Sequence, residues 1–197
     1  MADGFTLDLA HYQEVAESLC VDLPVVRAVA NVESTNSGFL PDGRPLILFE
    51  GHVFYKLLRS QAGLMPSKYV SLYPDIVYPK WDRSKYKGGA AEYDRLAIAK
   101  TIHEDCALQS ASWGAFQVMG MNHRACGWQS ITSFVADMEA DVANHFKAFM
   151  GYCRSFGLVG DLRARNWRSF ARKYNGSGQV DFYAKKLQEA YESFLGE

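Results

Sequence analysis

The sequence predicts an α+β domain that is mainly α-helical and contains one small β-hairpin. Apolar residues recur with a spacing of about 3.6 residues in seven segments, which is the period of an amphipathic helix. A Pro-Asp-Gly turn at residues 41–43 lies between two short apolar runs, which is typical of a hairpin. Hydrophobic residues make up 48% of the chain and charged residues 22%, so the chain has enough apolar material for a folded core.

Each element is expected from its local pattern. Helices are expected at residues 7–18, 23–33, 51–60, 91–108, 132–150, 161–174 and 180–195. In the second helix, Pro24 suits the first turn and Asp22 is a suitable cap. We expect residues 37–49 to form the hairpin and to be the main sheet element. Residues 66–89 are rich in Tyr, Pro, Lys and Gly, which predicts a long loop that can face a substrate.

The length predicts one domain. A typical domain has roughly 150 residues, so 197 residues correspond to about one. We expect residues 1–197 to form this domain without a second module. Residues 1–22 contain five acidic side chains and no Lys or Arg, which predicts an acidic N-terminal helix.

The charge balance and hydropathy argue against two classes of partner. The chain has 21 basic and 22 acidic side chains, for a net charge of -1. Nucleic-acid-binding proteins use an excess of positive charge, so DNA and RNA are not expected partners. No apolar stretch approaches the roughly 18 residues of a membrane span, and the first residues lack the pattern of an export signal. Stable membrane insertion is therefore not expected.

Two further side-chain patterns give expectations about the surface and the core. The chain has four scattered cysteines, which we expect to be small buried hydrophobes without disulfides, as in a reducing cytosol: Cys20, Cys106, Cys126 and Cys153. Arg165, Arg168 and Arg172 follow helical spacing. They predict either a face that meets a polyanion or a solvated face that an Asp161/Arg165 pair partly neutralises.

Glu33 is the candidate acid. The residues seven, four and three positions before it are Val26, Val29 and Ala30, so its side chain continues the apolar face of its helix. Partial burial and the negative end of the helix dipole both disfavour the charged carboxylate and are expected to raise its pKa. A carboxyl group protonated near neutral pH can donate the proton that glycoside cleavage requires. The alternative is a solvated Glu at a helix end.

Five runs along the chain carry a family resemblance: VES at 32–34, GFLPDGRP at 38–45, ILFEGH at 47–52, SWGAFQVMG at 112–120 and KYNG at 173–176. Together and in this order, they resemble the N-acetylmuramidase domains of phage and prophage endolysins, which belong to the lysozyme-like glycosidases. The resemblance spans about residues 25–195. It implies a lysozyme-like fold in which a catalytic Glu closes a helix and the hairpin forms one wall of a sugar-binding cleft. Longer relatives carry a separate peptidoglycan-binding module, which we do not expect in this chain.

The resemblance also implies a function. It implies a peptidoglycan hydrolase that cleaves the β-1,4 bond between N-acetylmuramic acid and N-acetylglucosamine, with Glu33 as the general acid. Such an endolysin would stay in the host bacterial cytoplasm until lysis and then act on glycan strands in the periplasm and cell wall, as a monomer without a cofactor. Two alternatives stay open. One is a lytic transglycosylase that forms 1,6-anhydromuropeptides, and the other is a cell-wall-binding protein without catalysis.

The second carboxylate is expected to be Glu50. It lies 17 residues after Glu33, and a hairpin between them can bring it across the cleft. The gap between the two carboxyl groups would then decide between a general base and a nucleophile. Alternatively, Glu50 is structural and either pairs with Arg44 or His52 or caps the following helix.

The remaining site residues follow from the resemblance. Ser112, Trp113 and Gln117 belong to the segment that forms the cleft floor. Gln117 can bind an N-acetyl group or position water, whereas Trp113 can stack on a sugar or pack in the core. Tyr174 and Asn175 are expected to line the cleft, with the Tyr174 hydroxyl near Glu33, or else simply to end a helix.

The histidines do not predict a metal site. His123 and Cys126 form an H-x-x-C pair, but no H-E-x-x-H motif accompanies them, so a zinc amidase is not favoured. His103 and His145 lie in amphipathic segments, where we expect either hydrogen-bonded or surface histidines.

Overall fold

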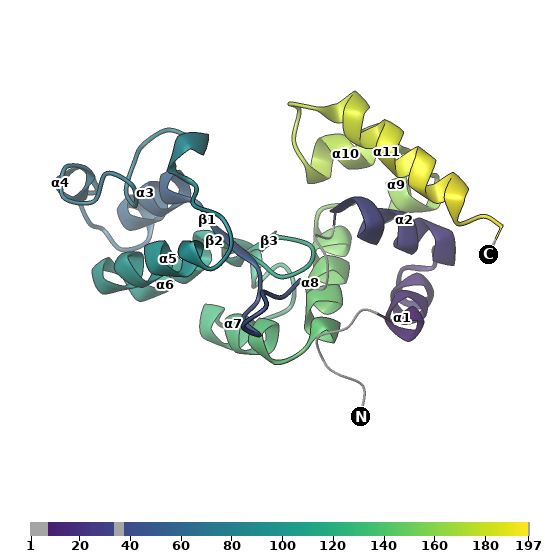
Figure 1. Cartoon of the computed structure of the whole chain (residues 1–197), viewed down its shortest axis with the longest axis horizontal. Helices are drawn as coiled ribbons and strands as arrows, with labels where there is room; N and C mark the ends of the chain where they lie inside the picture. The colour runs from purple at the N-terminus through teal and green to yellow at the C-terminus, as the bar shows by residue number, and fades with distance from the viewer. Residues whose placement is uncertain (1–7, 34–37, 197) are drawn as a thin grey trace.

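The computed structural model describes residues 8–33 and 38–196 (Figure 1). Residues 1–7, 34–37 and 197, some of which belong to the expected elements and runs, lie outside the described residues. The described part is mainly helical, with a small three-stranded sheet. Its α-helices are α1 (Leu9–Leu19), α2 (Leu23–Glu33), α3 (Gly51–Ser60), α4 (Ser67–Val70), α5 (Ala91–Ile102), α6 (Glu104–Gln109), α7 (Ile131–Ala140), α8 (Val142–Ser155), α9 (Val159–Arg163), α10 (Trp167–Tyr174) and α11 (Val180–Ser193).

The elements form two groups joined by a middle part. Figure 1 shows α3–α6 at one end of the molecule and α1, α2 and α9–α11 at the other. The sheet, α7 and α8 lie between them. No helix in the described part is long and apolar enough to cross a membrane.

Three expected helices are each divided into two. Residues 91–108 form α5 and α6, and residues 132–150 belong to α7 and α8. The breaks lie at His103 and Asp141, which have extended backbone and whose side chains accept a hydrogen bond from an amide in the first turn of the next helix. Residues 161–174 are divided in the same way into α9 and α10. The expected single helices were wrong because the apolar pattern continues through these caps.

The sheet differs from the expected hairpin. Leu40 and Arg44 close a tight turn by a hydrogen bond of 2.7 Å from amide to carbonyl, and one isolated bridge joins Phe39 to Pro45. The strand that follows, β1 (Ile47–Phe49), pairs antiparallel with β2 (Ala111–Trp113), and β2 pairs with β3 (Val118–Met119). The hairpin at residues 37–49 is therefore not the main sheet element. Local turn chemistry identified the turn but could not identify a partner strand more than 60 residues away.

One of the four cysteines departs from expectation. Cys106, Cys126 and Cys153 are buried and unpaired, as expected. Cys20 is exposed because it ends α1 with a left-handed backbone, at φ 51°. Its amide bonds back to the last turn of α1, so its role is that of a helix cap rather than a core residue.

The basic side chains between Arg154 and Lys173 do not form one charged face. Arg154 and Arg163 point toward α1, and each donates a 2.8 Å hydrogen bond to a backbone carbonyl at the C-terminal end of that helix. There they offset its negative dipole end. Arg165 lies in the turn before α10 and pairs at 3.3 Å with Asp22 instead of Asp161. The expected common helix face of Arg165, Arg168 and Arg172 was wrong because a helix ends inside the segment.

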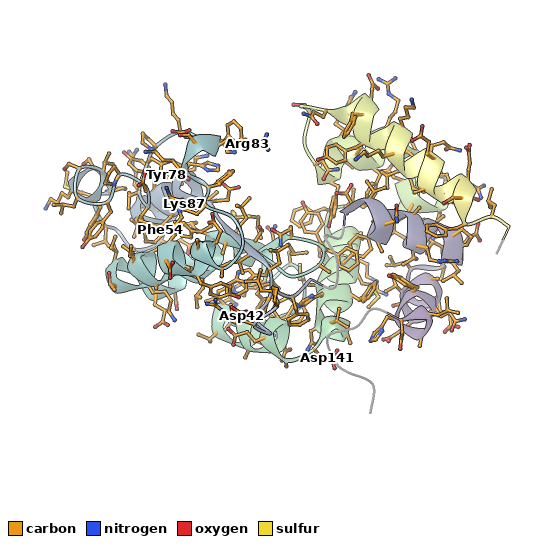
Figure 2. The ribbon with its side chains drawn as sticks, viewed as in Figure 1. Asp42, Phe54, Tyr78, Arg83, Lys87 and Asp141 are labelled. Atoms are coloured by element: carbon orange, nitrogen blue, oxygen red, sulfur yellow. The ribbon has the colours of Figure 1, made fainter. Side chains whose placement is uncertain are left out.

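The long loop is irregular as expected, apart from α4 and the 3-10 helix η1 (Arg83–Lys85). Figure 2 shows Tyr78 of this loop and Phe54 of α3 within the same group of helices, and Arg83 at the edge that faces α10. Tyr78 is 6% exposed, and its hydroxyl oxygen accepts hydrogen bonds from the Gly51 amide at 3.3 Å and from the Arg95 guanidinium at 3.2 Å. The loop is thereby attached to the start of α3.

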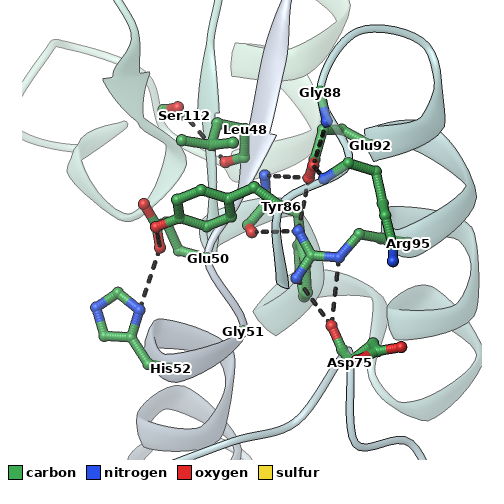
Figure 3. A network of polar contacts seen from close by, with 12 residues as sticks. Leu48, Glu50, Gly51, His52, Asp75, Tyr86, Gly88, Glu92, Arg95 and Ser112 are labelled. Atoms are coloured by element: carbon green, nitrogen blue, oxygen red, sulfur yellow. Dashed lines mark hydrogen bonds and ion pairs between the residues drawn. The ribbon is translucent and has the colours of Figure 1, made fainter. Parts of the chain in front are cut away.

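A buried ion pair joins the loop, the sheet and α5 (Figure 3). Glu92 is fully buried and contacts Arg95 at 2.7 Å. Its carboxylate also accepts hydrogen bonds from the amides of Lys87, Gly88 and Phe49. Burial opposes the charge of Glu92, but these amides and Arg95 outweigh it, so its pKa is lowered.

Arg95 completes the network on the other side. Its guanidinium donates to the carbonyls of Phe49 and Asp75, both at 2.9 Å, and to the Tyr78 hydroxyl at 3.2 Å. The residue that follows Phe49 in the chain is Glu50. The pair therefore fixes the backbone on which that candidate site residue lies.

Replacing Glu92 by Gln is expected to lower the free energy of unfolding by about 3 kcal/mol, because it leaves the Arg95 charge buried without its partner. Denaturant titration measures this. Glu104→Gln is the matched control, since its 2.9 Å pair with Lys100 is exposed and should contribute less than about 1 kcal/mol. Because the folded-state pKa of Glu92 is lowered, its contribution is complete above the ordinary value of 4.5 and is lost below it. An equal effect of the two substitutions would contradict this account.

Candidate active site

Glu33 is the last residue of α2 and lies at the edge of the core. Val26, Val29 and Ala30, on the same face of the helix, are each at most 2% exposed. Glu33 itself is partly buried. The position expected from the apolar face is therefore confirmed.

A pocket of about 220 Å³ lies beside this carboxyl group. Glu33 contributes from the end of α2, the β2–β3 turn contributes a second wall, and the ends of α8 and α10 contribute the others. Its lining residues are Glu33, Phe116, Gln117, Val118, Met119, Asn122, Tyr152, Tyr174 and Asn175. Three of the expected site residues besides Glu33 are thus brought together: Gln117, Tyr174 and Asn175.

The pKa of Glu33 is raised, as the sequence predicted. Burial of the carboxyl group is the largest cause. The Asn175 side-chain amide opposes it by donating a hydrogen bond of 2.8 Å to Glu33 Oε1, and the positive charge of Lys186 opposes it further. The net direction is still upward, so the carboxyl group keeps its proton to a higher pH than a solvated Glu.

Tyr174 is a fixed wall of the pocket. Its hydroxyl donates a 2.8 Å hydrogen bond to the backbone carbonyl of Phe116, which joins α10 to the β2–β3 turn. Its ring stacks on Phe170, with centroids 5.2 Å apart. Burial raises its pKa strongly, and the nearby charge of Glu33 raises it further. The phenol is therefore neutral, and its one proton is committed to Phe116.

Gln117 has a strained backbone and a fully engaged amide. Its φ of 47° is left-handed, which costs a non-glycine residue energy and requires support from its surroundings. The side-chain NH2 group donates to the carbonyls of Gly114 and Leu46, at 2.8 and 3.2 Å. Ser112 is buried and donates its hydroxyl to Gln117 Oε1 at 2.7 Å. Only the second lone pair of that oxygen is left for a substrate.

Ser112 and Trp113 do not contribute to the pocket surface. Trp113 is 1% exposed and donates its indole N–H to the Leu108 carbonyl at 3.1 Å. A ring without an open face cannot stack on a sugar, so the expectation of substrate contact by Trp113 is corrected to core packing. Ser112 acts one step away from the pocket, because its hydroxyl holds Gln117.

His145 supports the pocket turn from beneath. It is 1% exposed, accepts the Ala115 amide on Nδ1 at 3.1 Å and meets the Met138 carbonyl through Nε2 at 2.9 Å. Burial lowers its pKa to about 4, so the ring is neutral near pH 7. Gly114 has a φ of +70°, and a Cβ there would lie 2.7 Å from the ring. The expectation of a hydrogen-bonded histidine is confirmed, and its role is to hold the turn on α8.

Glu50 lies apart from this pocket. It precedes α3, where its side chain does not cap the helix, and it is not one of the nine residues that line the pocket of Glu33. The Tyr86 hydroxyl donates to Glu50 Oε2 at 2.7 Å, and His52 Nδ1 lies 3.1 Å from the same oxygen (Figure 3). Burial lowers the pKa of His52 despite this carboxylate. Of the three structural alternatives for Glu50, the structure shows the contact with His52. The helix cap is not made, and Arg44 pairs with Asp42.

Sequence reasoning missed several members of the site. Asn122 and Tyr152 line the pocket, and Lys186 acts on Glu33 through its charge. None of them belongs to a recognisable motif, and each comes from an element that only tertiary packing brings to α2. Among the described residues, no group of three His, Cys, Asp or Glu side chains is placed to hold a metal ion.

Comparisons with known proteins agree with one another. A family model described as N-acetylmuramidase matches residues 22–195. Among solved structures, the chain is similar to the crystal structure of the Burkholderia AP3 phage endolysin, with 39% sequence identity and a TM-score of 0.92. That similarity covers 100% of this chain and 74% of the other. No curated protein sequence matches the chain.

Asn175→Ala is expected to raise the pKa of Glu33 further, because it removes a hydrogen bond that favours the charged carboxylate. Carbon-13 NMR of labelled glutamate carboxyl groups, titrated with pH and assigned with Glu33→Gln, measures the shift. Asn122→Ala is the control: Asn122 lines the same pocket, but no hydrogen bond between it and Glu33 occurs in the described structure. An unchanged or lower pKa in Asn175→Ala would contradict the assignment.

Proposed function

This chain belongs to the N-acetylmuramidase family, whose members are glycoside hydrolases of peptidoglycan, and on that basis we propose a specific reaction and a specific acid. The reaction is hydrolysis of the β-1,4 bond between N-acetylmuramic acid and N-acetylglucosamine. The acid is Glu33. The observation that carries the proposal is a carboxyl group with a raised pKa at the wall of a pocket.

The chemistry needs a proton at the leaving oxygen. Glu33 transfers its proton to the glycosidic oxygen as the C1–O bond breaks and positive charge develops at C1 of the muramic acid ring. Water then adds to C1 and loses a proton. A carboxyl group whose pKa is raised suits the first step, because more of its acid form is present at a given pH than in a solvated Glu.

We propose that Asn175 selects the oxygen that carries the proton. Its amide N–H donates to Glu33 Oε1, which favours Oε1 as the carbonyl oxygen and Oε2 as the oxygen that holds the acidic proton. After transfer, the same hydrogen bond stabilises the carboxylate that remains. Gln117 and Tyr174 are proposed as pocket walls whose polar groups are held by the protein before substrate arrives.

Glu50 stays a candidate for the second carboxylate. Its bond from Tyr86 and its contact with His52 hold the carboxylate at the start of α3. As a general base it would activate the attacking water, and as a nucleophile it would bond to C1. The structural alternative is that Glu50 anchors the long loop through Tyr86, which the same hydrogen bond also supports.

A lytic transglycosylase is the second candidate. Glu33 is the only carboxylate among the nine residues that line the described pocket, and a transglycosylase requires only one. In that reaction the muramic acid 6-hydroxyl, instead of water, closes on C1. The products are then 1,6-anhydromuropeptides, which are one water lighter than hydrolysis products.

The proposed biological role is host cell lysis. The similar solved structure is that of a phage endolysin, and an endolysin role for this chain follows by analogy. We propose that the protein accumulates in the host cytoplasm as a monomer and reaches the glycan strands of the wall when another protein opens the membrane. Nucleic acid has no part in this role.

Glu33→Gln is expected to lower kcat on purified peptidoglycan by at least about 100-fold, since an amide keeps the shape but supplies no proton. Mass spectrometry of the released muropeptides gives both the rate and the product. The wild type should yield reducing muramic acid ends, whereas anhydro ends would indicate the transglycosylase. Glu189→Gln, an exposed carboxylate on α11, is the control and should keep wild-type turnover. Full activity of Glu33→Gln would refute the proposal.

Glu50→Gln is expected to cause a partial loss of kcat, smaller than that of Glu33→Gln. The amide still accepts the Tyr86 hydrogen bond but cannot act as a base or form a stable glycosyl ester. Tyr86→Phe separates the two roles, because it removes the contact and leaves the carboxylate. If Tyr86→Phe loses turnover and Glu50→Gln, which keeps the hydrogen bond, does not, Glu50 serves as an anchor. If only Glu50→Gln loses turnover, its charge takes part in the reaction.

A further inference from the structure

The pocket beside Glu33 is too small for the proposed substrate. Its volume of about 220 Å³ lies below the roughly 300–1,000 Å³ of pockets that enclose a drug-sized ligand. Cleavage of a glycosidic bond requires a sugar on each side of the bond. If the proposed function holds, the glycan must therefore continue across the surface next to the pocket.

A row of aromatic side chains leads from the pocket to the surface. Tyr174 and Tyr152 both line the pocket, with ring centroids 5.6 Å apart and rings nearly perpendicular. Phe156 follows Tyr152 by four residues and caps the C-terminal end of α8, and the two ring centroids are 4.4 Å apart. Phe156 is 44% exposed, so the row ends at a ring that is supported from one side and open to solvent.

We propose that Phe156, supported by Tyr152, is a stacking platform for the sugar next to the one in the Glu33 pocket. One face of a pyranose ring presents C–H groups, and a flat aromatic ring offers them apolar contact while the hydroxyl groups stay in water. Because the aromatic row is continuous with the pocket, the ligand that stacks on Phe156 is a further sugar of the same glycan strand. Phe156 then contributes to substrate binding and not to proton transfer.

The surroundings of Phe156 favour a neutral ligand over a charged one. Lys173, which passes beside the end of α8, bonds to the Gly157 carbonyl at 3.3 Å and pairs with Asp161 at 2.7 Å. Its charge is therefore already neutralised by the protein. A neutral sugar ring needs no counter-charge, and the open aromatic face supplies the contact it can use.

The test measures binding separately from hydrolysis. In a Glu33→Gln background, titration calorimetry with β-1,4-linked N-acetylglucosamine–N-acetylmuramic acid tetrasaccharides gives Kd without turnover. We expect Phe156→Ala to weaken binding about three- to tenfold, the range of one aromatic contact, and Phe156→Trp to retain it. Ile98→Ala, which removes an exposed apolar side chain on α5, is the matched control and should leave Kd unchanged.

The outcomes are distinct. Unchanged binding by Phe156→Ala, with an unchanged melting temperature, overturns the platform even if the wild type hydrolyses peptidoglycan. Weaker binding by Phe156→Ala, in a protein whose wild type releases no product, supports the platform and refutes only the proposed reaction. In the active enzyme, the same substitution should raise KM and leave kcat and the pH profile unchanged.

Discussion

The buried ion pair of Glu92 and Arg95 holds together the part of the molecule on which Glu50 lies. A charge in the protein interior is tolerated only when neighbouring groups replace the lost water, and here four donors surround one carboxylate. The donors come from the end of β1, the long loop and α5. Because one carboxylate serves all three segments, it fixes the path of the long loop against β1 and α5 (Figure 3).

In the pocket, a second glutamate, Glu33, has a pKa shifted in the opposite direction. Glu33 is also largely removed from water, but among the described residues one amide hydrogen bond, from Asn175, reaches it. Burial then outweighs the compensation, and its pKa is raised, whereas that of Glu92 is lowered. The number of donors therefore separates a structural glutamate from a candidate acid. A fully satisfied carboxylate has no proton to give.

The sequence was informative where the pattern is local. The apolar face of α2 placed Glu33 correctly, and the Pro-Asp-Gly turn was correct. It was misleading where a single capping residue such as Asp141 interrupts a continuous pattern, and where partners are distant in the chain, as for β1 and β2. The sequence left sugar stacking and core packing both open for Trp113, because an aromatic residue in a cleft-forming segment can point to either side of a strand. Asn175 was found by resemblance, but its hydrogen bond to Glu33 was not.

The pocket joins residues from opposite ends of the chain. Glu33 and Asn175 are 142 residues apart in sequence, and α11 packs against α2. A ribosome must therefore release nearly the whole chain before the acid gains its partner and the pocket its last wall. Until Asn175 has been synthesised, the pocket lacks the hydrogen-bond donor of Glu33, so the site forms only when α10 and α11 can pack against the rest of the fold.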